Sequence, residues 1–183
     1  MPNWCSTDIE IIGPTAEMKK LAAIVNSNDE PGFLQTICPG PEDWDYNWSV
    51  ENWGTKWDME TENFKLSEDG TKITGWSDSA WAPPLEAFQT YITKNHDVSI
   101  RCSYFEGGCD FAGIWHDGVD ECILPSDYKS GDFLDADRDT LLGQLDEDFG
   151  VGESLAWYEE DEAEQNRRDE KNGLFAEHSD VAN

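Results

Sequence analysis

The residues best suited to hold a metal ion form a run of aspartates in the last third of the chain. Asp135, Asp137, Asp139 and Asp146 occupy positions 1, 3, 5 and 12 of the pattern that calcium-binding loops follow. Thr140 stands where the sharp turn of such a loop needs glycine, and Asp146 stands where a bidentate glutamate is usual. Aspartates also gather at helix N-termini, where they oppose the positive end of the helix dipole. The sequence therefore favours a helix start over calcium binding here.

A second set of metal-ligand residue types comes from the middle of the chain. Its members are Cys102, Cys109, His116 and Cys122. Their spacings of 7, 7 and 6 residues match no compact zinc knuckle. Cys102 also alternates with Val98 and Ile100, which places it on the buried face of a strand. A buried apolar cysteine is the better interpretation, and we predict no metal cofactor.

Residues for covalent or phosphate chemistry follow none of the common catalytic motifs. The sequence has no GxSxG, no phosphate-cradling P-loop and no HExxH. Its three histidines, His96, His116 and His178, are scattered, and 40 acidic residues make acid pairs too common to be diagnostic. We predict no enzyme, no catalytic residue and no cofactor. A metal-dependent or hydrolytic enzyme, with the loop from Asp135 to Asp146 as its metal site, is the alternative.

Three of the nine tryptophans lie in two short stretches, Asn52–Asp58 and Ala80–Pro84. Clustered indoles imply either fixed packing or a fixed contact surface. A platform that stacks single-stranded bases also needs basic side chains for the phosphates, and few are present. We therefore interpret four residues as a scaffold that braces a corner of the sheet: Trp53, Trp57, Asp58 and Trp81.

Negative charge dominates the composition, with 12 basic and 40 acidic residues and a net charge of -28. Such a field repels nucleic acid and anionic lipid and favours basic partners. Plain solubility, or the surface of a halophile's protein, would explain the same charge. Residues 126–183 carry 5 basic and 18 acidic residues, a net of -13, against -15 for residues 1–125. This shift predicts a domain over 1–125 and an acidic C-terminal extension over 126–183.

The acidic residues are densest from Glu159 to Glu164, where five carboxylates fall within six residues. On a helix this is one charge per ~1.8 Å of axis, close to the ~1.7 Å of duplex DNA. We predict that this extension binds a basic partner as a DNA mimic would, whereas an ordinary solvated tail is the alternative. The predicted partner-binding residues are Glu153, Glu159, Glu160, Asp161, Glu162, Glu164, Asp169 and Glu170.

Hydrophobic periodicity predicts the elements that position these residues. Strands are expected over 7–11, 55–66 with a break, 71–76, 98–104, 111–115 and 122–124, with helices over 15–25 and 85–94 and an irregular segment over 33–50. The order β-α-β-β-α-β-β predicts an α+β, ferredoxin-like split βαβ fold, with two helices on one face of an antiparallel sheet. Beyond Pro125 we expect a partly helical extension. Asp139 would cap a short helix there, and Ser154 a longer one that ends before Gly173.

Five short stretches carry a resemblance to a known family: Met1–Cys5, Gly13–Pro14, Asn52–Asp58, Ala80–Pro84 and the hairpin from Tyr104 to Gly113. Over roughly residues 1–125 the sequence resembles the YubB-type ferredoxin-like domain family of phage, prophage and plasmid proteins. The resemblance implies the ferredoxin-like fold and a mobile-element setting. It implies no established reaction and no catalytic residues.

These observations together predict a non-enzymatic phage or mobile-element protein that binds and inhibits a basic host protein. A nucleic-acid-binding defence machine, such as a CRISPR or restriction complex, is the expected target. A structural or accessory virion component is a further alternative, and the oligomeric state stays open.

The cysteines and the hydropathy predict where such a protein acts. Five cysteines without a CxxC pair favour a reducing cytosol, the cytoplasm of the host cell. The sequence shows neither the pattern of a signal peptide nor an apolar stretch of about 20 residues, so we expect no membrane contact.

Overall fold

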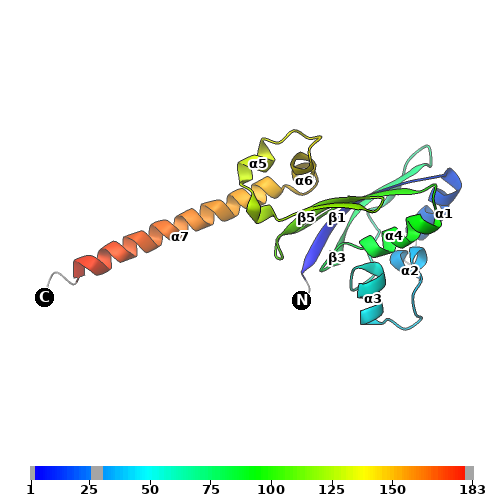
Figure 1. The fold of residues 1–183 in the computed structure, drawn as a ribbon, viewed down its shortest axis with the longest axis horizontal. Coiled ribbons are helices and arrows are strands. Elements are labelled where there is room, and N and C mark those ends of the chain that lie inside the picture. Colours follow the sequence, from blue (N-terminus) through cyan, green and yellow to red (C-terminus); the bar gives the residue numbers. More distant parts are fainter. Residues whose placement is uncertain (1–2, 26–30, 180–183) are drawn as a thin grey trace. The chain divides into compact units, whose positions relative to one another are not determined.

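A computed structural model describes residues 3–25 and 31–179, with side chains described through Asp169 (Figure 1). The chain divides into two units, Met1–Pro125 and Ser126–Asn183. The first unit is a mixed α+β arrangement and the second is helical. Each unit is therefore described by itself.

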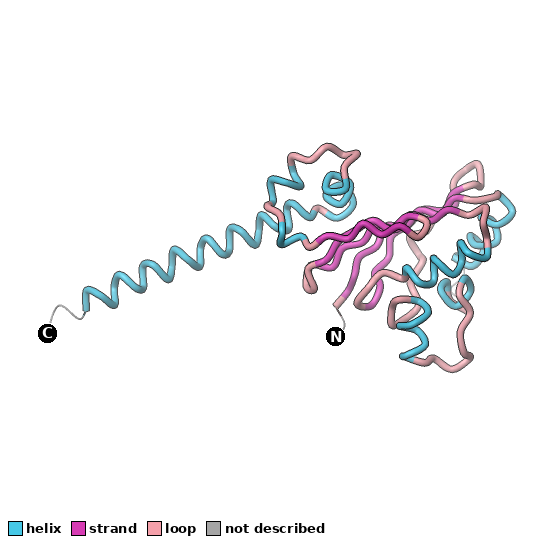
Figure 2. The backbone as a smooth tube through the Cα atoms, viewed as in Figure 1, coloured by secondary structure: helices cyan, strands magenta, loops and turns pink. Residues whose placement is uncertain are grey.

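The first unit is built on a six-stranded antiparallel sheet with the order β2-β3-β1-β4-β5-β6 (Figure 2). The strands are β1 Trp4–Ile12, β2 Lys65–Leu66, β3 Lys72–Ala80, β4 Ser99–Glu106, β5 Phe111–His116 and β6 Val119–Ile123. Ile9 lies opposite Gly75 on one side and Cys102 on the other, which fixes the register of the central strands. Because side chains alternate along a strand, Cys5, Ile9 and Ile11 point to one face and are buried.

Four helices accompany this sheet: α1 Thr15–Val25, α2 Phe33–Ile37, α3 Tyr46–Trp53 and α4 Leu85–Lys94. The predicted α+β class is confirmed, as are the helices that became α1 and α4. The prediction of an irregular segment over 33–50 was wrong, because α2 lies within it and α3 begins within it. Asp45 caps the start of α3 by accepting from the N–H of Trp48, and left-handed Gly54 ends the helix. The capping residue Asp45 is the signal in the sequence that predicts the start of α3.

The predicted strand over 55–66 was also wrong, because only Lys65–Leu66 pair with β3. Before Phe64 the backbone does not pair with a neighbouring strand, and polar side chains form hydrogen bonds to distant parts of the fold instead. Thr55 Oγ1, for example, donates to the carbonyl of Ala80 at 2.9 Å. Phe64 is buried against Gly75, whose missing side chain leaves room for the ring. The segment therefore crosses the edge of the sheet as a packed loop.

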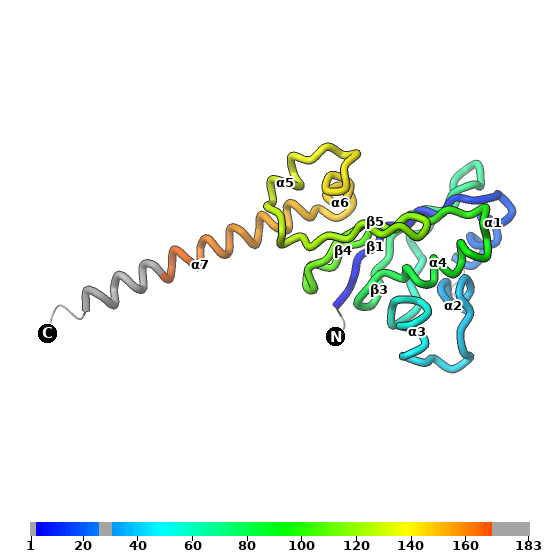
Figure 3. Tube along the Cα trace, viewed as in Figure 1, coloured from blue at the N-terminus to red at the C-terminus, as the bar shows by residue number. Residues whose placement is uncertain are grey.

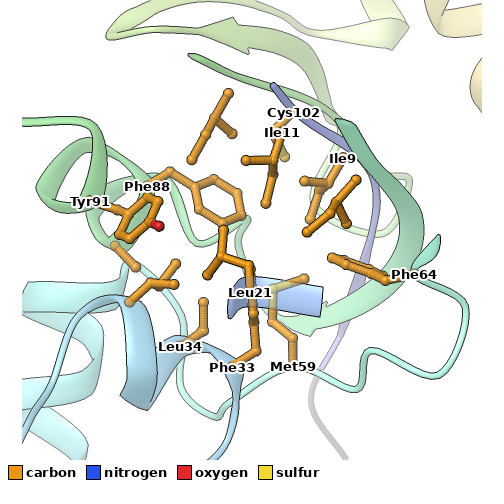
Figure 4. Packing of buried hydrophobic residues seen from close by; sticks show 14 of the residues in the cluster. Ile9, Ile11, Leu21, Phe33, Leu34, Met59, Phe64, Phe88, Tyr91 and Cys102 are labelled. Atoms are coloured by element: carbon orange, nitrogen blue, oxygen red, sulfur yellow. The ribbon is translucent and has the colours of Figure 1, made fainter. Parts of the chain in front are cut away.

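The core of the first unit lies between the buried face of the sheet and its helices (Figure 4). Ile9, Ile11 and Cys102 come from the sheet, Leu21 from α1, and Phe88 from α4. Cys102 is fully buried, and burial raises the pKa of its thiol well above the usual value, so it packs as a small apolar side chain.

The second unit contains a 3-10 turn and three helices. They are η1 Pro125–Asp127, α5 Ser130–Leu134, α6 Leu141–Phe149 and α7 Val151–Ser179 (Figure 3). A small core of Phe133, Leu145 and Val151 joins the three helices.

Three expectations for this unit were wrong. Thr140, rather than Asp139, caps α6 by accepting from the N–H of Gly143. Asp146 Oδ1 accepts from the N–H of Gly152, so α7 starts before the predicted Ser154 cap. α7 also runs through Gly173, since a single helical glycine costs only about 1 kcal/mol.

Replacing Phe64 by Ala tests the packed loop. We expect Phe64→Ala to lower the free energy of unfolding by about 3–5 kcal/mol in urea denaturation, because it leaves a cavity between Phe33 and Gly75. The half-exposed control Leu124→Ala should lower it by less than about 1 kcal/mol. Equal effects from the two substitutions would show that residues 55–64 are not anchored through Phe64.

Candidate binding site

The four predicted scaffold residues lie in two different environments. Trp53 is buried, donates from Nε1 to the carbonyl of Cys38 at 2.9 Å, and meets Trp48 edge-on with ring centroids 5.5 Å apart. Trp57 and Trp81 lie at the surface and are 36% and 39% exposed. The indoles therefore do not form one cluster, since Trp53 packs inside while Trp57 and Trp81 face solvent.

Asp58 acts as a cap for a helix that is distant in sequence. Its carboxylate accepts from the N–H groups of Leu34 at 2.7 Å and Gln35 at 3.0 Å, in the first turn of α2. It also accepts from the N–H of Met59 at 2.8 Å. The N-cap residue of α2, Gly32, has no side chain that could accept from these N–H groups. A Cβ on Gly32 would collide with the Asp58 carboxylate. Asp58 thus joins the 55–64 loop to α2.

A groove opens beside Trp57 at the edge of the sheet. The stretch of β3 from Trp76 to Ala80 pairs with β1 on one side, but on its other side β2 pairs only with Ile73 and Thr74. Residues of the 57–63 loop therefore line the groove on that side. The groove has a cavity volume of about 680 Å³. Its lining combines indoles and acids: Trp4, Trp57, Asp58, Glu60, Glu62, Asn63, Trp76, Ser77, Asp78 and Ala80.

Three exposed indoles supply the apolar part of this groove, which we call the indole groove. The rings of Trp4 and Trp57 lie 6.0 Å apart with an interplanar angle of 43°. Trp76 is 58% exposed, and it shares the outer face of the sheet with Trp4, as the pairings Trp4–Ala80 and Asp8–Trp76 show. Sequence analysis missed Trp4 and Trp76 because it could not supply the register of β1 against β3. The alternation along each strand was the available signal.

Carboxylates form the rim of the indole groove. Glu60 and Glu62 are exposed, and neither has a hydrogen bond or ion pair with any residue in the described part of the chain. Asp78 is exposed, and its Oδ1 accepts from Ser6 Oγ at 2.9 Å. Indole faces carry negative π density, so the walls and the rim favour the same kind of ligand, a cation.

A cation already lies on this aromatic surface. The Lys56 ammonium is 4.3 Å from the ring centroid of Trp57 and 5.0 Å from that of Trp81. The loop that carries it is held by Trp44, whose Nε1 donates to the Lys56 carbonyl at 3.0 Å. The Trp81 ring also meets Tyr46, with centroids 5.9 Å apart.

The predicted partner-binding acids lie on α7, and they differ in how free their carboxylates are. Glu159 accepts from Ser130 N at 3.2 Å and Ser130 Oγ at 2.8 Å, which ties α7 to the start of α5. Glu164 pairs with Arg168 at 3.0 Å, and Asp169 accepts from Gln165 at 3.1 Å.

The remaining predicted acids have no such partners. The carboxylates of Glu153, Glu160, Asp161 and Glu162 are solvent-facing, with no hydrogen bond or ion pair to any side chain or backbone group within residues 3–25 and 31–169. The side chain of Glu170 lies outside the described residues. Four of the eight predicted acids are thus available to a partner.

The aspartates of the calcium-like pattern serve local structure. Asp135 ends α5 as its C-cap, and the carbonyl of Asp137 accepts from Thr140. The carbonyl of Asp139 accepts from Gln144, and the Asp146 carboxylate caps α7. Across the described residues, no three His, Cys, Asp or Glu side chains are arranged to hold a metal ion.

The cysteines and histidine of the zinc pattern are spread over the sheet. Cys102 is buried, whereas Cys109, His116 and Cys122 are exposed. Cys109 lies in the turn after β4, where its Sγ accepts from Asn3 Nδ2 at 3.1 Å. Its backbone N–H donates to the buried carboxylate of Glu106. These contacts give Cys109 a structural role in the turn.

Comparison with protein-family models, curated proteins and solved structures finds no match to this chain. The resemblance to the YubB-type family therefore stays a prediction. Among the helices of the described residues, none combines the length and the apolar character that crossing a membrane requires.

Removing the Asp58 carboxylate tests its role as a distant cap. Asp58→Ala should lower the free energy of unfolding by about 1–3 kcal/mol, because it leaves the N–H groups at the start of α2 without an acceptor. Asp43→Ala, at an exposed carboxylate, should change it by about 0.5 kcal/mol or less. Urea denaturation of both variants measures the difference, and a harmless Asp58→Ala would contradict the role of this carboxylate.

The Glu159–Ser130 contact makes a prediction about pH. The two hydrogen bonds from Ser130 lower the pKa of Glu159 below its ordinary value of 4.5. A carboxyl group with a lowered pKa stabilises the folded state above the ordinary value and loses that effect as the pH falls through the folded value. Glu159→Gln should therefore be less stable than the unmodified chain at neutral pH, and the difference should shrink as the pH falls below 4.5.

Thermal unfolding followed by circular dichroism measures this gap. The matched control is Glu162→Gln, because the Glu162 carboxylate has no partner among residues 3–25 and 31–169. The control should show no closing gap as the pH falls. A Glu159→Gln gap that is independent of pH would refute the contact.

Proposed function

We propose that this protein binds and inhibits a basic, nucleic-acid-binding host protein and catalyses no reaction. Its acidic helix would occupy the surface on which that host protein holds nucleic acid. The observation that carries the proposal is the exposed, largely unpaired row of carboxylates on α7.

The arrangement of α7 supports a contact surface on one side of the helix. Glu153, Trp157, Glu160 and Glu164 follow at i, i+4, i+7 and i+11, so they share a helix face. Glu159, which bonds to Ser130 of α5, lies off this face. Carboxylates beside an exposed indole suit a basic protein surface, since aromatic residues often supply the affinity and charges the encounter rate.

The charge along α7 supports imitation of DNA. Residues 151–169 hold seven acidic residues and two arginines, a net of 2 − 7 = −5. A helix rises about 1.5 Å per residue, so the stretch from Glu159 to Glu164, with five carboxylates in six residues, approaches the linear charge density of a duplex. Because the carboxylates fan around the helix axis, only some of them can face a basic groove of the partner. The carboxylates on the other faces of α7 would then remain solvated.

The fold supports a ferredoxin-like assignment for the first unit. The order β2-β3-β1-β4 is antiparallel throughout, with α1 following β1 and α4 following β3, which is the pattern of a split βαβ sheet. On this assignment β5 and β6 extend the sheet, and α2 and α3 are insertions. From the resemblance of its short sequence stretches we also propose that the chain is related to YubB-type proteins of phages and plasmids. Its unpaired cysteine pattern and its negative charge support action in the host cytoplasm on a CRISPR or restriction complex.

Neutralising α7 tests the proposed function. The variant Glu160→Gln, Asp161→Asn and Glu162→Gln removes three unpaired charges and keeps the side-chain sizes. The matched control is Asp43→Asn, Glu51→Gln and Glu68→Gln, which removes three exposed charges from the first unit. Immobilised full-length chain should capture a basic protein from host lysate and release it when duplex DNA is added.

The α7 variant should bind the captured protein at least about ten-fold more weakly, because its loss of long-range and contact electrostatics exceeds ~1.4 kcal/mol. The control variant should bind within about two-fold of the unmodified chain. Capture that duplex DNA does not displace, or that both variants retain equally, would overturn the proposal.

A further inference from the structure

We propose that the indole groove receives the guanidinium group of an arginine side chain on the basic partner. The inference rests on the proposed function and adds a second contact to it, on the first unit rather than on α7. Three features carry it: the indole walls, the carboxylate rim, and the Lys56 ammonium that already lies on Trp57.

The walls offer exposed π faces on which a planar cation can stack. The rings of Trp4 and Trp57 lie 6.0 Å apart, are inclined at 43° and contact each other, so together they form one wall of the groove. Trp76 is well exposed at the same groove. A cation within about 6 Å of an indole centroid is attracted by the ring, and tryptophan is the strongest of the aromatic residues in this respect.

The rim supplies the hydrogen-bond acceptors. Glu60 and Glu62 have no partner in the described part of the chain, and Asp78 shares one of its oxygens with Ser6. Asp58 belongs to the lining but is committed to backbone N–H groups, so it positions the loop instead of binding the ligand. Two free carboxylates next to π faces match a guanidinium group, which can stack and donate in its own plane at the same time.

Lys56 is independent evidence that this surface attracts cations. Its ammonium lies over two indoles, Trp57 and Trp81, and forms no salt bridge with a carboxylate of the described residues. Within the described part of the chain, the aromatic rings therefore hold this cation without a counter-ion. The same Trp57 forms one wall of the indole groove, where carboxylates add to the attraction.

Other ligand classes fit this groove less well. A nucleic-acid base would stack on the indoles, but its phosphates would meet Glu60, Glu62 and Asp78. A purely apolar ligand would leave those carboxylates beside a surface of low polarity. A lysine ammonium satisfies the charge but is more strongly hydrated than a guanidinium and lacks its planar fork.

The test uses full-length chain and three short peptides that differ only at the central residue, arginine, citrulline or lysine. Citrulline has the shape of arginine without its charge. Nuclear magnetic resonance of the indole N–H groups measures binding. The arginine peptide should shift the signals of Trp4, Trp57 and Trp76 in a saturable manner, the lysine peptide should bind more weakly, and the citrulline peptide should cause no saturable shift.

Two variants remove the groove in different ways. Trp76→Ala removes one wall, and Glu60→Gln with Glu62→Gln removes the rim charge without altering a strand. Each should weaken arginine-peptide binding by about five-fold, whereas Val119→Ala, at an exposed side chain of β6, should bind as the unmodified chain does.

Four results would overturn the inference: equal binding of arginine and citrulline peptides, equal binding of arginine and lysine peptides, no shift of these three indoles, or unchanged binding in both groove variants. The α7 variant Glu160→Gln, Asp161→Asn and Glu162→Gln should bind the arginine peptide normally. Failure of the groove would thus be distinguished from failure of the proposed function, which that variant tests through the host protein.

Discussion

Three backbone N–H groups converge on the carboxylate of Asp58, and the loop that lines the indole groove depends on this convergence. Asp58 stands 24 residues after Leu34, so its bond closes a large loop and supplies a helix start that has no local cap. Phe64, packed on Gly75, anchors the other end of the same segment. Because the segment is anchored at Asp58 and at Phe64, the adjacent Trp57 is held against Trp4. The acidic residues between Asp58 and Phe64 are kept at the surface.

Charge sets a second constraint on the molecule. Twelve basic residues cannot neutralise 40 acidic ones, so most carboxylates must face water or a partner from outside the chain. Asp58, Asp146 and Glu159 accept from backbone or hydroxyl groups, whereas Glu164 pairs with Arg168. Carboxylates with no partner among the described residues are found, among other places, on α7 and at the indole groove. Both places therefore favour ligands of positive charge.

The hydrophobic pattern of the sequence was sufficient to predict the strands and helices that keep a single periodicity along their length. Alternation identified β1 and β4, and the helical stripe identified α1 and α4. It failed for α2, whose cap comes from Asp58, and for residues 55–64, whose side chains bond across the fold. For the site, the sequence pointed to Trp57 but could not add Trp76, because the register of β3 against β1 is a long-range property. The acids of α7 were visible as a run, whereas the engagement of Glu159 with Ser130 was not.

The central claim is that carboxylates of this protein engage a cationic counterpart. The most direct test is the association rate constant with the captured host protein, measured by stopped flow between about 50 mM and 200 mM salt. The account predicts a rate constant that falls steeply across this range, because screening weakens the attraction that guides the encounter. A rate constant that does not change with salt would contradict it.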